Sequence, residues 1–511
     1  MGVSSAHKEF DRPGRQALLL AYCLVISAVL LGLCSRSSPL YPLNDWVDTN
    51  CFFTVGKAMF NGRVVYRDIY EQKGVLLYFL YGLAWLFSHT SFLGVYVLEV
   101  LCMALFLYLT CRTAALLVSP RAYCLVLPGL AAVLCSSYAF YLGGSVEQLG
   151  LALLYLPLHC MIRTYVTGGG YLPARGWVIA LGAAAGCLLW MKFTLLGVYI
   201  GYVLFVIVVQ LVRRDPAGLL RAAGCFLLGL LAASLPWLLY FGLHHALRDA
   251  FVSYFYNNIA LYPQLEGSRL SFVLENLRHG LFWNARMALL IALGVLAVLL
   301  SRSSRPLKLG LFSLYFCTVL FLYIGGAAYD YYAFGMAALT VPGAMAAAWL
   351  LQRGWQLPWK GRSAPAFRPA VSAALCLLLL LGGGLFARRH SVNSFYTAYD
   401  RQDMWYSDFA RIIEQSEDRS LLNYGFLDLG EYTVTGYVPQ SKFFCVLNLD
   451  LPEMRQEIED SVRDRKTMFI VTIAYEDDPL LTENYELVKR IDSFYEFEEV
   501  PMSYYLLQRR E

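Results

Sequence analysis

The fold is decided by the stretch between the first two apolar segments, which reads NDWVDTNCFF at residues 44–53 and NGRVVYRDIYEQKG at residues 61–74. Together with the intervening Lys57, it places three aspartates and four cations among aromatic side chains. A loop that only joins two membrane spans needs no such charges, because ionisable groups near a bilayer are costly and mark function. A carboxylate serves acid–base chemistry and a cation serves phosphate, so the stretch indicates chemistry on a lipid phosphate.

The composition is that of a polytopic membrane protein. The chain has 511 residues, of which 58% are hydrophobic and only 15% are charged, and its mean hydropathy is +0.51. The net charge of +4 is small and spread over loops, which argues against nucleic acid as a partner. Most of the 13 cysteines lie singly inside apolar runs without CxxC spacing. They therefore predict buried small side chains rather than a metal or redox site.

Twelve apolar runs have the length of a membrane span, which predicts an all-α polytopic domain of about 11–13 transmembrane helices over residues 17–386. The first run, Ala17–Leu33, is too long for a signal-peptide core and is expected to be a retained anchor. The runs are 17–34, 74–88, 92–118, 121–141, 147–162, 174–191, 193–212, 219–240, 286–301, 307–325, 331–351 and 370–386.

The remaining residues, 387–511, are polar and predict a small α/β domain. Helix-like segments such as Pro452–Arg463, where a proline starts the helix and acids fill its first turns, separate short β-rich stretches. The expected strands are Leu421–Phe426, Lys442–Leu447, Met468–Ile473 and Tyr504–Gln508.

Lysines and arginines predict the orientation in the plasma membrane, because they gather on the cytoplasmic side of multi-pass proteins. They occur in residues 1–16, 212–221, 301–308 and 352–369, all of which are expected to be cytoplasmic. The outer loops 35–73 and 241–285 and the C-terminal domain are then extracytoplasmic. A cytoplasmic N-terminus and an extracytoplasmic C-terminus require an odd number of spans. One of the runs between residues 74 and 192 is therefore not a full crossing, as a split or re-entrant segment would be, and the sequence does not identify it.

A series of motifs, in order along most of the chain, is shared with one known family. They are DTNCFFTVG at 48–56, NG at 61–62, YRD at 66–68, EQKG at 71–74, GGSVEQ at 143–148, MKF at 191–193, DYY at 330–332 followed by Pro342, NYG at 423–425 and YVPQSKFF at 437–444. The series resembles the GT-C fold glycosyltransferases, which are polyprenyl-phosphate-sugar enzymes related to protein mannosyltransferases and the aminoarabinose transferase. The chain departs from them at Lys73-Gly74-Val75, where many relatives have Lys-Gly-Pro or Lys-Pro-Pro, and at Asp330-Tyr331, near which several relatives carry a His-Tyr pair.

The resemblance implies an inverting glycosyltransferase that moves a sugar from a polyprenyl-phosphate donor to a glycan, lipid or protein acceptor on the outer membrane face. Asp48 would be the general base that removes the acceptor proton while the phosphate leaves on the opposite side. The alternative for Asp48 is an N-cap of the helix that begins near Asn50. Asp68 would orient acceptor or sugar, or else form a salt bridge with Arg67 or Lys73. Asp45 shares the site, binds a metal or is a turn residue.

Lys73 suits the leaving phosphate, because an ammonium is a compact cation at the mouth of a span, although interfacial lysines also snorkel. Tyr66, Arg67 and Tyr331 belong to the same motifs and are expected to bind substrate. Arg269 is expected to contact phosphate, and the aromatic loop around it otherwise suits an interfacial amphipathic helix.

Two further charges, Glu147 and Lys192, lie at the ends of apolar segments that face outward. Charged groups at membrane depth are functional by default. Glu147 is expected to bind sugar hydroxyls, to hold a cation or to pair with Lys192. Asp45, Asp48 and Glu147 could together bind a divalent cation, but their spacing does not match a fixed pattern of oxygen ligands that would require one.

Other classes of protein remain as alternatives. The sequence has no glycine-rich nucleotide loop, which favours a lipid-linked donor over a nucleotide sugar. A polytopic transporter or flippase of lipid-linked glycan would spread its charges along a midplane path, show inverted repeats and have little extracytoplasmic fold. A non-catalytic scaffold with a degenerate site is the third alternative, against which the intact Asp48 and Lys73 argue.

Overall fold

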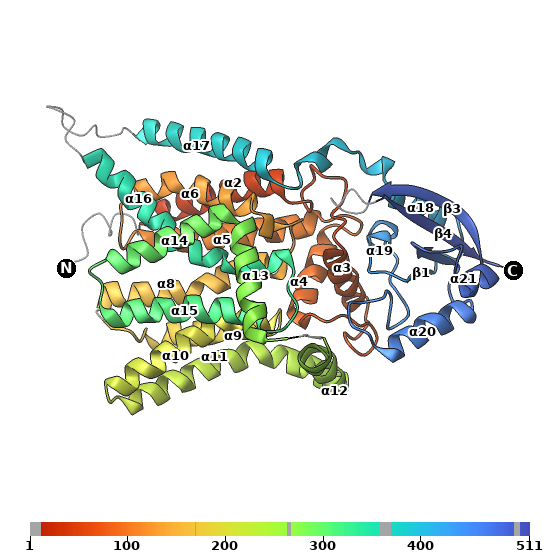
Figure 1. The fold of residues 1–511 in the computed structure, drawn as a ribbon, viewed down its shortest axis with the longest axis horizontal. Helices are drawn as coiled ribbons and strands as arrows, with labels where there is room; N and C mark the ends of the chain where they lie inside the picture. Colours follow the sequence, from red (N-terminus) through yellow and green to blue (C-terminus); the bar gives the residue numbers. More distant parts are fainter. Residues whose placement is uncertain (1–11, 169, 263–266, 357–368, 495–500, 511) are drawn as a thin grey trace.

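The computed structural model describes residues 12–168, 170–262, 267–356, 369–494 and 501–510. A bundle of long helices is joined at one end to a small domain that contains all the strands (Figure 1). This arrangement confirms the predicted fold class, a polytopic helical domain with a C-terminal α/β domain. Four of the residues used to predict orientation, Lys8, Lys360, Arg362 and Arg368, lie outside the described residues.

Each of the twelve predicted apolar runs forms a helix. These helices are α2 (Pro13–Cys34), α4 (Val75–Phe87), α5 (Leu93–Ala114), α6 (Pro120–Cys135), α8 (Leu151–Gly168), α9 (Arg175–Leu189), α10 (Gly197–Val212), α11 (Pro216–Leu243), α14 (Ala285–Leu300), α15 (Arg305–Tyr323), α16 (Val341–Gln356) and α17 (Pro369–His390). By length and apolar composition, seven helices of the described chain can each cross a membrane, or eight if the bent pair α13–α14 is one span. Three shorter apolar helices are α4, α6 and α9.

The helix α4 resolves the odd-number requirement. The neighbouring helices α2 and α5 run antiparallel, because Arg112 donates to Gln16 near one end of the pair (2.9 Å) and Tyr96 donates to Ala28 O near the other (2.7 Å). The end of α2 and the start of α5 therefore lie at the same end of the bundle, and α4 between them cannot be a crossing. Its 13 residues extend about 20 Å, well short of a bilayer core of about 30 Å. Removing α4 from the twelve predicted runs leaves eleven, the odd number that the expected orientation requires.

The segments that join the long helices supply short elements. They are α3 (Val47–Phe60), η1 (Tyr138–Phe140), α7 (Val146–Leu149), η2 (Phe193–Leu196), α12 (Leu247–Ala250), the π-helix η3 (Phe251–Leu261), α13 (Arg269–Trp283) and η4 (Asp330–Thr340). The loop 241–285 is thus largely helical, and α13 is bent by 106° from α14, so that it lies across the bundle (Figure 1).

The C-terminal domain is built on a four-stranded sheet with the order β1-β2-β4-β3. The strands β1 and β2 are parallel, and β4 pairs antiparallel with both β2 and β3. Its elements are η5 (Ser394–Ala398), η6 (Arg401–Asp403), α18 (Trp405–Glu414), β1 (Leu421–Tyr424), α19 (Glu431–Thr435), α20 (Pro452–Arg463), β2 (Phe469–Thr472), α21 (Pro479–Asn484), β3 (Tyr485–Phe494) and β4 (Pro501–Arg509). The helix α18 packs on the sheet through the stacked rings of Trp405 and Tyr504 (4.2 Å).

One predicted strand is wrong and one strand was missed. Lys442–Leu447 is an irregular segment, because its backbone bonds elsewhere: Lys442 O accepts from Tyr70 N of the outer loop (2.9 Å), and Val446 N donates to Phe426 O (3.1 Å). The missed strand β3 is an edge strand with many charged side chains, a pattern that protects sheet edges but hides them from a search for apolar runs.

Candidate active site

Asp48 lies in the first turn of α3, where the positive end of the helix dipole favours a carboxylate. The N-cap residue of α3 is Trp46, and no side chain caps the helix. The N-cap interpretation of Asp48 is therefore wrong. Its Oδ2 instead accepts a hydrogen bond of 2.9 Å from the hydroxyl of Tyr331 on η4, and the Tyr331 ring packs edge-on against Trp46. The carboxylate is thus held by a segment almost 300 residues away in the sequence.

Asp48 faces a narrow pocket, which we call the central pocket, between the outer loop, a group of tyrosines and the C-terminal domain. Its lining consists of Asp48, Cys51, Glu71, Gln72, Lys73, Tyr262, Tyr329, Tyr331, Leu427, Leu447 and Asn448. The volume is about 10 Å³, which is at the limit for a single water molecule. A ligand larger than a water molecule therefore enters only when one wall moves.

Lys73 is placed in the central pocket by an unusual turn. Tyr66 adopts a left-handed backbone conformation (φ +70°), and its hydroxyl donates to Lys73 O (2.5 Å). Its buried ring stacks on Phe241 of α11, so the turn is fixed to the bundle. The following Gly74 lies against α9: a Cβ there would come within 2.0 Å of Trp190 O. Only glycine allows this approach, which explains the glycine after Lys73.

Carboxylates keep Lys73 charged. Its backbone N donates to Glu71 Oε2 (2.8 Å), and its Nζ lies 4.0 Å from Glu71 Oε1. Burial by itself lowers the pKa of Lys73, but the negative charges of Glu71 and Asp48 outweigh it and raise that pKa well above its ordinary value. The central pocket thus holds a permanent cation beside two carboxylates.

Glu147 and Lys192 form an ion pair with each other. The Lys192 Nζ lies 2.5 Å from Glu147 Oε1, and the two side chains are 8% and 0% exposed. The ammonium also lies 3.4 Å from the ring centroid of Tyr332 and 5.2 Å from that of Tyr331. Burial and the charge of Lys73 lower the pKa of Lys192, against the opposing effect of Glu147. The pair therefore lies beside the tyrosine that holds Asp48, and neither residue lines the central pocket.

Glu99, to which the sequence assigns no role, positions the segment that carries Glu147. Its carboxylate accepts hydrogen bonds from Ser35 Oγ (2.8 Å) and from the backbone N of Gly144. Gly144 has a positive φ of 81°, and Tyr81 donates to its carbonyl oxygen (2.6 Å). This buried carboxylate therefore has a structural function.

The C-terminal domain is fixed to α3 by a buried polar cluster. Lys57 Nζ donates to Tyr432 O (2.6 Å), and Thr54 Oγ1 donates to Asp428 Oδ2 (2.7 Å). Burial lowers the pKa of Lys57 to about 7, although Asp428 and Glu431 oppose the shift, and burial raises the pKa of Asp428 to about 6. These charges give the interface a defined register, which brings Asn448 and its neighbours to the pocket of Asp48.

Besides Tyr66, Glu147 and Lys192, four further predicted site residues do not line the central pocket. Asp45 pairs with the buried Arg36, which in turn packs on the ring of Tyr396. Asp68 pairs with Arg67 at 2.7 Å and accepts a hydrogen bond from Val64 N (2.9 Å).

Arg67 also donates to His244 O (2.8 Å), so it joins the outer loop to the end of α11. Arg269 is exposed at the start of α13. The contacts of Asp45, Asp68 and Arg67 are those of structural residues.

The sequence also missed several residues of the central pocket. Glu71 belongs to the EQKG motif at residues 71–74, and its position two residues before Lys73 could have indicated that it lies in the pocket. Tyr262, Tyr329 and Asn448 gave no local signal, because distant segments bring them together. Tyr329 links them: its hydroxyl lies 3.0 Å from that of Tyr262 and accepts a long contact of 3.4 Å from Asn448 Nδ2.

Few side chains near the central pocket are placed to bind a metal ion. Within the described ranges, no group of three or more His, Cys, Asp or Glu side chains is arranged to hold one. The Asp45 carboxylate is directed to Arg36 and Glu147 to Lys192, so neither joins Asp48.

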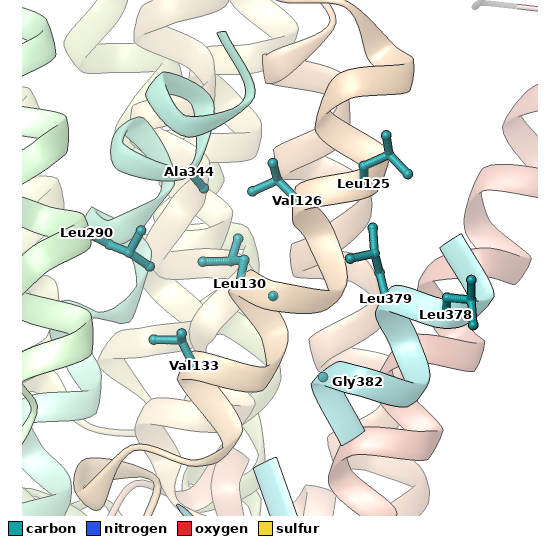
Figure 2. Close-up of a pocket in the computed structure, with 11 residues that line it drawn as sticks. Leu125, Val126, Leu130, Val133, Leu290, Ala344, Leu378, Leu379 and Gly382 are labelled. Atoms are coloured by element: carbon teal, nitrogen blue, oxygen red, sulfur yellow. The ribbon is translucent and has the colours of Figure 1, made fainter. Parts of the chain in front are cut away.

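A second cavity lies between α6, α14, α16 and α17 and is open to the surface beside the exposed Leu378 and Leu379 (Figure 2). It has a volume of about 420 Å³. Leucines, valines, alanine and glycines line it, and no ionisable group does so in the described chain. Such a lining suits an apolar chain and cannot carry out chemistry.

Comparisons with known proteins identify the fold. No family model matches the sequence, and no curated protein sequence does. The structure is similar to that of ArnT from Cupriavidus metallidurans bound to undecaprenyl phosphate, with a TM-score of 0.62 and 14% sequence identity over 96% of this chain and 98% of that chain. The apo state of the same protein matches with a TM-score of 0.58 at the same identity and coverage. The chain is therefore an integral membrane protein with the fold of the GT-C glycosyltransferases.

Proposed function

We propose that the protein is an inverting glycosyltransferase, which transfers a sugar from a polyprenyl-phosphate carrier to a hydroxyl group of a glycan, lipid or protein on the outer face of the plasma membrane. The N-terminus is then cytoplasmic and the C-terminal domain extracytoplasmic. One observation carries the proposal: a single pocket holds the Asp48 carboxylate, oriented by Tyr331, beside the permanently charged Lys73. The likeness to a protein bound to undecaprenyl phosphate supports this class of carrier.

The chemistry follows from the charges of the central pocket. Asp48 takes the proton of the acceptor hydroxyl as its oxygen attacks the anomeric carbon. The bond between that carbon and the carrier phosphate breaks on the opposite face, which inverts the configuration. Negative charge then develops on the departing phosphate, and Lys73 stabilises it in a site with little water. The proton ends on Asp48, and no step requires a metal ion.

The C-terminal domain favours an enzyme over a transporter. It contributes Leu427, Leu447 and Asn448 to the wall opposite the outer loop. A transporter would spread its charges along a midplane path and have little fold beyond the bundle, whereas here a whole domain forms a wall of the pocket that holds Asp48. A catalytic site gains from such closure, because excluding water strengthens electrostatic stabilisation of the transition state.

The test is sugar transfer by the purified protein in lipid nanodiscs. Radiolabelled polyprenyl-phosphate hexoses and pentoses are supplied as donors, with wild type beside Asp48→Asn, and the configuration of the product is read by NMR. We expect carrier-dependent transfer with inversion in the wild type and its loss in the variant. We expect EDTA to leave the rate unchanged. Donor binding without any turnover across a panel of acceptors would contradict the proposal and favour a transporter or a scaffold.

A further inference from the structure

A polar cleft outside the central pocket lies between α13 and the start of η4. We call it the α13 cleft, and its polar and aromatic walls include Glu275, Asn276, His279, Trp283, Tyr329 and Asp330. Its volume is about 270 Å³, just under the roughly 300 Å³ at which pockets for small ligands begin. The side chains of His279 and Asp330 are 54% and 35% exposed, so the cleft is open on one side.

Tyr329 is a wall of both the α13 cleft and the central pocket. Its ring stacks parallel to Tyr331 at 5.9 Å, and the hydroxyl of Tyr331 donates to Asp48. One stacked pair of tyrosines thus separates the cleft from the carboxylate. A molecule held in the cleft reaches Asp48 when the exposed Tyr329 moves, while Tyr331 keeps its hydrogen bond to Asp48.

The composition of the α13 cleft is suited to a sugar. Carboxylates and amides bind hydroxyl groups, and the exposed face of Trp283 offers a platform for a pyranose ring. The Trp283 ring is fixed from behind by Tyr138, whose centroid lies 5.3 Å away. Asp330 Oδ1 lies 3.2 Å from His279 Nε2, and no hydrogen bond or ion pair of Glu275 occurs among the described residues. Glu275 is therefore available to a ligand.

The charge of the α13 cleft predicts which kinds of sugar can bind there. Two carboxylates and one imidazole line it, and no lysine or arginine does so in the part of the chain that the structure describes. An anionic ligand would be repelled, so the phosphate of the donor belongs in the central pocket with Lys73. We propose that the α13 cleft binds one neutral or cationic sugar residue of the acceptor and directs its hydroxyl toward Asp48. This inference rests on the proposed function, since it assigns a place to the acceptor of that reaction.

The experiment measures binding alone, in the absence of any donor. The probes are hexyl glycosides of glucose, glucosamine and glucuronate, with hexanol as a control for partition into lipid. The full-length protein in nanodiscs reports binding through the fluorescence of Trp283, isolated by subtracting the signal of Trp283→Phe. The variants are Glu275→Gln/Asp330→Asn, with Arg278→Gln as the matched control on the solvent side of the same helix.

We expect saturable binding of the glucoside and glucosaminide, with at least tenfold weaker binding of the glucuronide. The double variant should weaken binding of the glucosaminide tenfold or more, whereas Arg278→Gln should bind as the wild type does. Equal binding of the glucuronide, a signal that hexanol reproduces, or unchanged affinity in the double variant would overturn the inference. Intact binding in a wild type that transfers no sugar would count against the proposed function alone, and transfer without saturable binding would count against the cleft alone.

Discussion

The buried pair Glu147–Lys192 offers the sharpest energetic prediction. Replacing Glu147 by Gln leaves the Lys192 ammonium without its partner in a place where only 8% of the side chain is exposed. Removing one member of a buried ion pair costs about 3–5 kcal/mol. The contact with the face of Tyr332, 3.4 Å from the ammonium, is present with and without Glu147, so it does not change this cost. We therefore expect a loss of about 3–5 kcal/mol in the free energy of unfolding.

The measurement is equilibrium unfolding in detergent micelles, followed by tryptophan fluorescence. The double variant Glu147→Gln/Lys192→Met removes both charges and should recover most of the loss, because a buried ion pair adds little over an apolar replacement. Asp450→Asn breaks the exposed pair with Arg455 and should leave stability unchanged. A Glu147→Gln variant as stable as the wild type, or a double variant as unstable as the single one, would refute the reasoning.

Three further predictions concern Asp48, the domain interface and the outer loop. Tyr331→Phe removes the hydrogen bond to Asp48 and should lower kcat about tenfold with an unchanged KM for the donor. A hydrogen bond to a charged group contributes about 1.5 kcal/mol or more, which corresponds to this factor. An unchanged kcat would show that catalysis does not use the bond. Lys57→Met leaves Asp428 and Glu431 buried without their cation, at a cost of about 3 kcal/mol. The buried Cys445, whose Sγ lies 3.9 Å from that of Cys51 on α3, reports opening of the interface: its maleimide labelling, measured by mass spectrometry, should rise more than a hundredfold, whereas the exposed Lys489→Met should leave it unchanged. The hydrogen bonds that Asp68 accepts from Arg67 and from Val64 N lower the pKa of Asp68. The ionised Asp68 therefore stabilises the outer loop fully above the ordinary aspartate pKa of about 3.9, and this stabilisation is lost as the pH falls through the lower pKa of the folded state. Hydrogen exchange of residues 63–70, corrected for intrinsic rates, should therefore rise between pH 5 and pH 3 in the wild type and be independent of pH in Asp68→Asn, and equal pH dependence in both proteins would exclude this role.

The predictable parts of the structure are those set by local patterns. Apolar runs give the helices, and the motif around Asp48 and Lys73 gives the central charges, since both residues belong to one continuous loop. Closeness in sequence does not decide the contacts of Asp45. It lies three residues before Asp48, but it precedes the start of α3 and turns to Arg36 instead.

Parts that depend on distant segments could not be predicted. Tyr329 and Asn448 meet only because the buried cluster around Lys57 fixes the C-terminal domain on α3. Whether α4 crosses the membrane depends on the antiparallel packing of α2 and α5, and this packing cannot be read from the length of an apolar run. Lys442–Leu447 has the composition of a strand, but its backbone bonds to the outer loop and Phe426 exclude it from the sheet.

The most direct test of the central claim compares two carboxylates of one loop under single-turnover conditions. Asp48→Asn and Asp68→Asn are each mixed in excess with a polyprenyl-phosphate sugar that the wild type accepts, and the rate of sugar transfer is followed. General-base catalysis contributes about 10²- to 10⁴-fold, so we predict a loss of that size in Asp48→Asn. Asp68→Asn should remain within a few-fold of the wild type, since its carboxylate is engaged by Arg67 and Val64. Transfer at the wild-type rate by Asp48→Asn, or a larger loss in Asp68→Asn, would contradict the assignment of the base.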